Sequence, residues 1–264
     1  MTWIDFELCG TSISCTIEIV RLENLALAMA NLPKAWLAWS SGKDSAWALH
    51  AVRQTREVNV VALLTTINRD YSRVAMHAVR ESLVEMQAAA VGLALVKVPI
   101  PAHCKNQDYE RSMASAMERA RSEGVFHIVF GDLFLEDIRA FREKNLTACG
   151  MKAVFPLWRR NTRVLANEML EGGLSAYITC VDPARLDRAF AGRRFDSKLL
   201  AELPREVDPC GENGEFHTFA CAGPMFRPPL LISVGEIVER DGFVFADLLP
   251  GAEVAMAPYL SRGA

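Results

Sequence analysis

Short apolar runs alternate along the chain with longer stretches in which apolar residues recur every three or four positions. The run 58–65 is almost continuously apolar and rich in Val and Leu, which is typical of a strand covered on both faces. The stretch 107–121 instead places Met113, Met117 and Ala120 on one face of a helix. Strands that alternate with helices pair in parallel through right-handed crossovers. The pattern therefore predicts an α/β fold with a doubly wound parallel sheet.

The same pattern gives expected bounds for the individual elements. Pro, Gly and helix-capping residue types mark where they begin and end. In the first part of the chain we expect strands at 36–39, 58–65, 94–98 and 125–130 and helices at 46–53, 74–90 and 107–121. Further along we expect helices at 162–170 and 197–203 and strands at 176–181, 215–219, 230–238 and 243–248.

Changes in this pattern divide the chain into three parts. Residues 1–33 form an N-terminal extension with alternating apolar positions, typical of a strand, at 13–19 and an amphipathic helical stretch at 22–32. Residues 34–160 carry the strand–helix alternation and form the expected parallel-sheet domain. Residues 161–264 form a smaller α+β C-terminal domain, which follows a connector.

The most informative stretch is 40–45, between the strand 36–39 and the helix that follows it. A strand that breaks at small residues and turns into a helix presents backbone N–H groups at the positive end of that helix, which is an anion site. Gly42 lets the backbone approach a ligand, the serine hydroxyls donate hydrogen bonds and Lys43 adds charge. The candidate phosphate-binding residues are Ser40, Ser41, Gly42, Lys43, Asp44 and Ser45.

This loop is not a Walker A motif, because Asp44 follows Gly42-Lys43 and Leu37 stands where that motif has its first glycine. It resembles the PP-loop, Ser-Gly-Gly-x-Asp-Ser, of enzymes that cut ATP between its α- and β-phosphates. Ser41 replaces the first glycine of that pattern, and a serine serves there if its φ is negative. A plain strand–turn–helix with serine caps is the alternative.

A second polar cluster follows the expected strand 125–130. Gly131 and Asp132 leave that strand directly, at the sheet edge where ligands of doubly wound proteins bind. Arg139, on the following helix, can bind a phosphate or a carboxylate. A Mg²⁺ ion that bridges ATP oxygens needs one or two carboxylates, although Glu136 is also an ordinary acid for a helix N-terminus. The candidate metal ligands are Asp44, Asp132 and Glu136.

The third informative stretch is 208–219, which combines two glycines, two glutamates and a histidine. Gly-Glu-Asn-Gly alone is compatible with a hairpin turn. Along the strand that follows, alternation places Glu215 and His217 on one face. A strand face with a carboxylate and an imidazole beside a glycine loop favours a substrate site, with Glu212, Glu215 and His217 as its candidates.

Together these strings resemble the diphthine–ammonia ligase (diphthamide synthase) family of PP-loop ATP-binding proteins, whose sheet is adenine nucleotide α-hydrolase-like. The resemblance covers about 34–248 and leaves 1–33 out. It is carried by 40–45, by Gly131-Asp132 with Glu136 and Arg139, and by 211–216 with Thr218.

The resemblance implies a reaction and its participants. ATP, with Mg²⁺, would adenylate a substrate carboxylate and release pyrophosphate, and ammonia would then displace AMP to leave an amide. The acceptor would be a small molecule or a protein side chain. The backbone around Thr66 would hold adenine, and Gly131, Asp132 and Arg139 would also contact the nucleotide. The implied catalytic residues are Lys43, Asp44, Glu212, Glu215 and His217.

Composition narrows the remaining alternatives. A net charge of −3 argues against wholesale nucleic-acid binding, so a tRNA-modifying PP-loop enzyme lacks its basic platform. A non-enzymatic ATP-binding sensor would not need the cluster at 212–218. No apolar run approaches the ~20 residues of a membrane span, and the N-terminus does not resemble a signal peptide. Seven scattered cysteines without a Cys-x-x-Cys pair fit reduced thiols in the cytoplasm, and a homodimer is left open.

Overall fold

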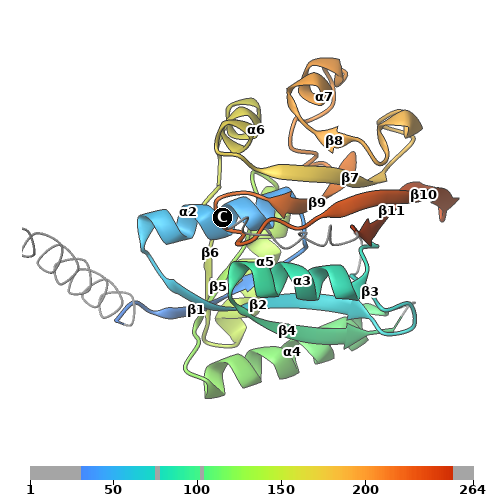
Figure 1. Ribbon diagram of the computed structural model, residues 1–264. Helices are drawn as coiled ribbons and strands as arrows, with labels where there is room; N and C mark the ends of the chain where they lie inside the picture. The colour runs from blue at the N-terminus through green and yellow to red at the C-terminus, as the bar shows by residue number, and fades with distance from the viewer. Residues whose placement is uncertain (1–30, 75–77, 102–103, 252–264) are drawn as a thin grey trace, which may run out of the picture.

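The computed structural model describes residues 31–74, 78–101 and 104–251, and these residues form two sheets with helices packed between and around them (Figure 1). The strand expected at 13–19 and the helix expected at 22–32 lie outside the described residues. Within the described part of the chain, no helix is long and apolar enough to cross a bilayer.

Sheet A is parallel except at one edge, with the spatial order β4-β2-β1-β5-β6. The chain runs outward from β1 through β2 to β4 and then returns to the other side of β1 for β5 and β6. This order confirms the doubly wound prediction and places the topological switch point between β1 and β5. The strands are β1 Lys34–Ala38, β2 Asn59–Asn68, β4 Ala94–Ile100, β5 His127–Val129 and β6 Lys152–Val154, with β3 Arg73–Val74 antiparallel to the end of β2.

Helices cover both faces of sheet A because successive residues of its strands point to opposite sides. On β1, Leu37 belongs to the core beneath α2 and α3, whereas its neighbour Trp36 belongs to the core beneath α4 and α5. The helices are α2 Lys43–Thr55, α3 Glu81–Val91, α4 Asn106–Ser122 and α5 Glu136–Ala148.

Sheet B is antiparallel, and β7 is paired with β8, β9 and β11. It confirms the expected α+β character of the C-terminal part. Sheet A ends at Val154 and sheet B begins at Ser175, so the domain boundary predicted at 160/161 falls between them and stays a prediction. The elements are α6 Thr162–Glu171, β7 Ser175–Val181, η1 Arg188–Phe190, β8 Arg194–Phe195, α7 Ser197–Glu202, β9 Phe216–Ala222, β10 Ile232–Arg240 and β11 Phe243–Pro250.

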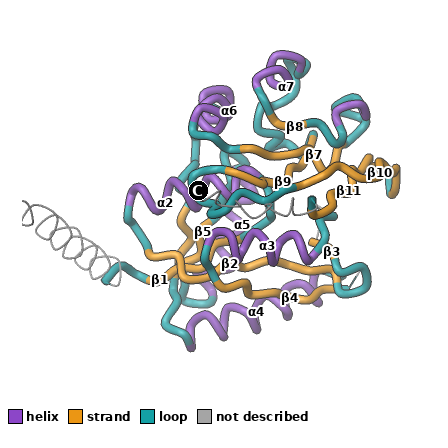
Figure 2. The backbone as a smooth tube through the Cα atoms, in the orientation of Figure 1, coloured by secondary structure: helices purple, strands orange, loops and turns teal. Residues whose placement is uncertain are grey.

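The two sheets share one hydrophobic core. Helices α2 and α3 lie between sheet A and sheet B (Figure 2), and their buried residues Leu49 and Leu83 belong to the same cluster as Phe219 of β9. Burial of this continuous apolar surface fixes β9 directly above the N-terminal end of α2. The carboxyl edge of sheet A is therefore roofed by the C-terminal domain.

Three expectations about local structure are wrong. The helix predicted at 74–90 begins only at Glu81, because Arg73–Val74 pairs with β2. Strand β6 was not expected, since three residues carry too little periodicity and only its pairing with β5 defines it. Helix α2 begins at Lys43 rather than Ala46, and Gly42 is its N-cap without a side-chain capping bond.

Candidate functional site

A cavity of about 400 Å³ opens at the carboxyl edge of sheet A, at the switch point between β1 and β5. Its walls come from the ends of β1, β2 and β5, from α4 and α5, and from β9 with the loop before it. This is the place where doubly wound sheets bind ligands. Of the predicted site residues, those that line it are Ser40, Lys43, Asp44, Ser45, Thr66, Gly131, Asp132, Glu212 and His217.

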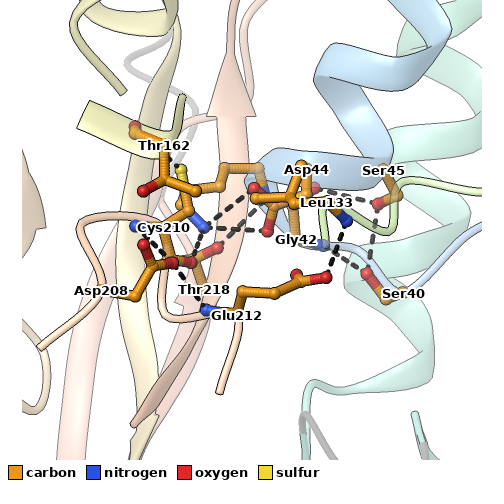
Figure 3. A network of polar contacts seen from close by, with 11 residues as sticks. Ser40, Gly42, Asp44, Ser45, Leu133, Thr162, Asp208, Cys210, Glu212 and Thr218 are labelled. Atoms are coloured by element: carbon orange, nitrogen blue, oxygen red, sulfur yellow. Dashed lines mark hydrogen bonds and ion pairs between the residues drawn. The ribbon is translucent and has the colours of Figure 1, made fainter. Parts of the chain in front are cut away.

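The segment Ser40–Ser45, which we call the phosphate loop, is closed by a ring of hydrogen bonds (Figure 3). The Gly42 N–H donates to Ser40 Oγ at 3.3 Å, Ser40 Oγ donates to Ser45 Oγ at 3.2 Å, and Ser45 Oγ donates to the Gly42 carbonyl at 3.0 Å. The first bond inside the helix is Ala46 N–H to Gly42 O. The amides of Asp44 and Ser45 thus have no partner within α2, which is the feature that makes a helix N-terminus bind anions.

Ser41 does not meet the condition of a negative φ that the comparison with the PP-loop set for a serine at this position, because its φ is +71°. A non-glycine residue in this left-handed region costs about 1 kcal/mol or more. The loop therefore has the backbone geometry that a glycine would adopt freely, and the serine is held in it. The Ser41 side chain is fully buried, and its hydroxyl has no hydrogen-bond partner among the residues that the structure describes.

Gly131 lets the end of β5 approach the phosphate loop. A Cβ at this position would lie 2.9 Å from the Asp44 carbonyl carbon and oxygen and 2.9 Å from the Ser45 nitrogen. These are backbone atoms that cannot move aside. The steric reason for a glycine here is contact with the first turn of α2, and the structure places Gly131 and Asp132 on the cavity wall as well.

Lys43 points toward the C-terminal domain and is 1% exposed. Its ammonium donates to both carboxylate oxygens of Asp44, at 2.8 and 3.0 Å, and to the Cys210 carbonyl. It also lies 5.5 Å from the ring centres of Phe195 and Phe216. Burial disfavours the ammonium, but the attraction of Asp44 outweighs it and leaves the pKa of Lys43 above its usual value. The bond from the Lys43 ammonium to the Cys210 carbonyl, with that from the Lys43 N–H to Thr218 Oγ1 at 3.1 Å, joins the phosphate loop to the C-terminal domain.

The cavity contains an ion pair of which only the acid, Asp132, was predicted from the sequence. Arg142 of α5 donates to Asp132 at 3.0 Å, with a second nitrogen–oxygen distance of 2.9 Å, and stacks over the ring of Phe130. Arg139, the arginine predicted from sequence, instead pairs with Glu143. The two arginines are three positions apart on the same helix, so a small difference in the rotation of α5 about its axis decides which of them lines the cavity.

Four other predicted residues also lie off the cavity lining: Ser41 and Gly42 of the phosphate loop, Glu136 and Glu215. Glu136 pairs with Arg159 on the surface and is 67% exposed. Glu215 is buried and holds the loop before β9, because it accepts hydrogen bonds from the Asp208 N–H and from Asn213 Nδ2, both at 3.0 Å. The structure does not bring Glu215 to the face that His217 presents.

The segment 208–215, which we call the glutamate loop, is ordered by Asp208. One carboxylate oxygen of Asp208 accepts from the N–H groups of Cys210 at 3.2 Å and Glu212 at 3.0 Å. These bonds aim Glu212 across the cavity, where its carboxylate accepts from the Leu133 N–H at 2.7 Å (Figure 3). The glutamate loop of one domain therefore contacts the strand end of the other.

The environment of Glu212 makes it a proton acceptor near neutral pH. Burial raises the pKa of Glu212 to about 7, with the charges of Asp44 and Asp132 acting in the same direction. Burial also lowers the pKa of His217 to about 4, helped by Lys43, so its imidazole is neutral. A carboxyl group that titrates near 7 beside an anion site is typical of functional sites.

The remaining wall of the cavity is apolar. Helix α4 contributes Tyr109, Met113 and Met117, whose presence in the cavity the sequence did not indicate because a methionine stripe is also typical of a core. Thr66 lies at the end of β2 beside this surface. An apolar wall with polar groups at one end suits a flat heterocycle attached to an anionic tail.

A parallel sheet with a PP-loop at its switch point, roofed by a smaller antiparallel domain, defines a PP-loop α/β protein. Two family models match the chain in the same order: the diphthamide synthase N-terminal domain at residues 33–153 and the diphthamide synthase C-terminal domain at residues 161–245. The chain belongs to the diphthamide synthase family.

Individual relatives carry a consistent name. The chain is 25% identical over 222 residues to a diphthine–ammonia ligase of Schizosaccharomyces pombe, 27% over 154 residues to one of Bos taurus, and 28% over 178 residues to one of Danio rerio. These matches cover 76%, 56% and 62% of this chain. The chain spans 36% of the length of the S. pombe relative, 57% of the bovine one and 70% of the zebrafish one.

Proposed function

We propose that this protein is an ATP-dependent amide ligase that forms AMP and pyrophosphate and uses ammonia as the nitrogen source. The observation that carries the proposal is the pairing of two groups across one cavity. The phosphate loop offers N–H and hydroxyl donors on one wall, and Glu212, with a pKa of about 7, lies on the other. The relatives named diphthine–ammonia ligase support this reaction class.

In this proposal the phosphate loop binds the β- and γ-phosphates of ATP. The donors are the amides of Asp44 and Ser45 in the first turn of α2, together with the hydroxyls of Ser40 and Ser45. Adenine occupies the apolar wall near Thr66 and Met113. The α-phosphorus then lies between the phosphate loop and the glutamate loop, where an incoming carboxylate can attack in line with the leaving pyrophosphate.

The proposal also includes Mg²⁺, for which the cavity offers few carboxylate ligands. No group of three or more His, Cys, Asp or Glu residues lies close enough to hold a metal ion in the part of the chain that the structure describes. A Mg²⁺ ion that arrives on a triphosphate needs only one or two carboxylates, and Asp44 and Asp132 line the cavity. Bound there, the ion would neutralise charge on the leaving pyrophosphate.

The reaction has two balanced steps. A carboxylate oxygen of the acceptor bonds to the α-phosphorus, the bond to the bridging oxygen of the β-phosphate breaks, and pyrophosphate leaves with that electron pair. Ammonia then bonds to the acyl carbon, the acyl–oxygen bond breaks, and AMP leaves. The added nitrogen loses one proton, for which Glu212 is the acceptor because its pKa lies near 7.

The acceptor in this proposal is a carboxylate, and the names of the relatives make diphthine the first candidate. The cavity is built from residues of one chain, so the proposal needs no second copy. His217, neutral at pH 7, can accept a hydrogen bond from the acceptor or from ammonia without repelling either.

The test measures products. The protein is incubated with ATP, Mg²⁺ and ammonium, with and without a diphthine-bearing protein, and AMP, pyrophosphate and ADP are quantified. The proposal expects AMP and pyrophosphate in equal amounts, dependent on acceptor and ammonium. ADP as the product, or ATP that stays bound and uncleaved under every condition, would overturn it, and the second outcome would favour a nucleotide sensor.

Glu215→Ala separates the two loops in the same assay. Because Glu215 holds the glutamate loop and does not line the cavity, ATP binding should be retained while acceptor-dependent turnover falls. Loss of ATP binding in a folded variant would contradict this division of labour.

A further inference from the structure

Gln87 is a fully buried amide at the junction of three segments that lie far apart in the sequence. Its Oε1 accepts from the Trp39 indole N–H at 2.7 Å, and its Nε2 donates to the carbonyls of Ser41 at 3.0 Å and Ala220 at 2.6 Å. An indole only donates and a carbonyl only accepts, so chemistry fixes the orientation of this amide. Gln87 thus joins α3, the phosphate loop and β9.

The bond to Ser41 acts on the peptide that opens the phosphate loop. The Ser41 carbonyl also accepts from the Ala220 N–H at 2.9 Å, so two donors hold it against β9. In a planar trans peptide the carbonyl and the following N–H point in opposite directions. The Gly42 N–H is therefore turned away from β9, into the ring that contains Ser40.

The backbone conformation of Ser41 is unfavourable by itself, so contacts with other segments must stabilise it. Its φ of +71° is unfavourable for a residue with a Cβ, and its own hydroxyl has no hydrogen-bond partner in the described part of the chain that would compensate. Relaxation of φ is a rotation about the Ser41 N–Cα bond, and it would move the Ser41 carbonyl away from its two donors. The donors on Ser41 O oppose that rotation.

We propose that Gln87 is a positioning residue for the phosphate loop: it holds the Ser41 carbonyl against β9 and so keeps the loop in the conformation that brings Ser40, Ser45 and the first turn of α2 to the cavity wall. Docking of the C-terminal domain acts on the same atom through Ala220. Gln87 does not line the cavity, and it acts through Ser41. This inference rests on the proposed binding of a triphosphate by the loop.

The test compares affinity for ATP and for pyrophosphate, by calorimetry, in wild type, Gln87→Leu, and Gln87→Leu with Ser41→Gly. Leucine leaves the Ser41 and Ala220 carbonyls without the amide donor, so affinity should fall about tenfold or more. Glycine adopts a positive φ without steric cost, so the double variant should recover most of that loss. Ser41→Gly alone is the reference with which the double variant is compared.

Val84→Ala is the matched control, because Val84 is a fully buried apolar residue on the same helix and should lower the melting temperature without changing affinity. If Gln87→Leu does not fold, Gln87→Asn replaces it, since its amide is one methylene too short for both carbonyls. Wild-type affinity in a folded Gln87 variant, or a loss that glycine at 41 does not reduce, would overturn the inference. A wild type that binds neither probe would instead overturn the proposed function.

Discussion

The phosphate loop and the glutamate loop face each other across one cavity, yet they are built in different ways. The phosphate loop is closed by its own serines and by the first turn of α2. The glutamate loop is closed by two acids, Asp208 and Glu215, whose carboxylates accept its backbone and side-chain N–H groups. One loop therefore presents donors and the other presents a single carboxylate, Glu212.

The difference teaches how the two walls divide the proposed chemistry. Donors and a helix N-terminus stabilise a phosphate chain whatever its acceptor is. A carboxyl group whose pKa is raised to about 7 can accept a proton but binds no anion. Nucleotide binding should therefore depend on the phosphate loop. Transfer of the acyl group to ammonia should depend on the glutamate loop.

Asp44→Ala should have the largest effect, because Asp44 belongs to the phosphate loop and is also the ion-pair partner of Lys43. Turnover should be lost, by about 10³-fold or more if Asp44 holds charge at the transition state. The variant should also be less stable by about 3–5 kcal/mol, since a buried ammonium loses its counter-charge. AMP release and denaturant unfolding measure the two effects.

Lys43→Met combined with Asp44→Ala is the control for that result. The apolar methionine removes the unpaired charge, so stability should return toward wild type while turnover stays absent. Turnover that survives in Asp44→Ala would show that the phosphate loop is not the catalytic wall.

Glu212→Gln should reduce turnover by about 10²–10⁴-fold while ATP affinity is retained, because glutamine still accepts from the Leu133 N–H but takes no proton. The wild-type rate should rise with pH through about 7, as the Glu212 carboxylate forms. This ascending limb should disappear in the variant. A pH profile of acceptor-dependent AMP release measures it.

The same substitution should raise stability at alkaline pH. The pKa of Glu212 is higher in the folded protein than in the unfolded chain, so its contribution to stability is complete below about pH 4.5 and is lost as pH rises through about 7. Glutamine removes that cost, and the variant should unfold at higher denaturant than wild type above pH 7. A variant less stable at every pH would mean that Glu212 is only structural.

Gly131→Ala tests the contact between the loop wall and β5. The new Cβ would overlap the backbone of Asp44 and Ser45, which should cost about 1–3 kcal/mol of stability and raise the KM for ATP. Gly172→Ala is the control, since its Cβ would meet the Trp47 side chain instead and should affect stability alone. An unchanged KM in Gly131→Ala would show that the loop tolerates displacement.

The two loops also differ in how far sequence could predict them. The phosphate loop was found from its string because its bonds join residues at most five apart. The negative φ that was set as a condition for a serine at position 41 is not met, because the Ser41 carbonyl is bonded to Gln87 and Ala220, which lie far away in the sequence. In the glutamate loop, strand alternation does not apply before β9 begins at Phe216, so it did not separate the buried Glu215 from Glu212. The role of Arg142 could not be predicted either, because it depends on how α5 is rotated about its axis, which the local sequence pattern does not determine.

Asp247→Asn should have the smallest effect, because it acts on the link between the domains away from both loops. Asp247 of β11 accepts from Arg73 at 3.0 Å and from Arg80, and so ties sheet B to the segment that carries Val74 against the cavity. The partners are partly exposed, so the loss should be about 1 kcal/mol at pH 7.

Burial opposes the charge of Asp247, but the two arginines outweigh it and hold its pKa below the usual range. The link therefore stabilises the fold above pH 4 and is lost as pH falls through the folded pKa. Unfolding free energies of wild type and variant should differ at pH 7, and the difference should shrink as pH falls through the folded pKa of Asp247. A difference that does not change with pH would show that asparagine acts through its shape and not through the lost charge.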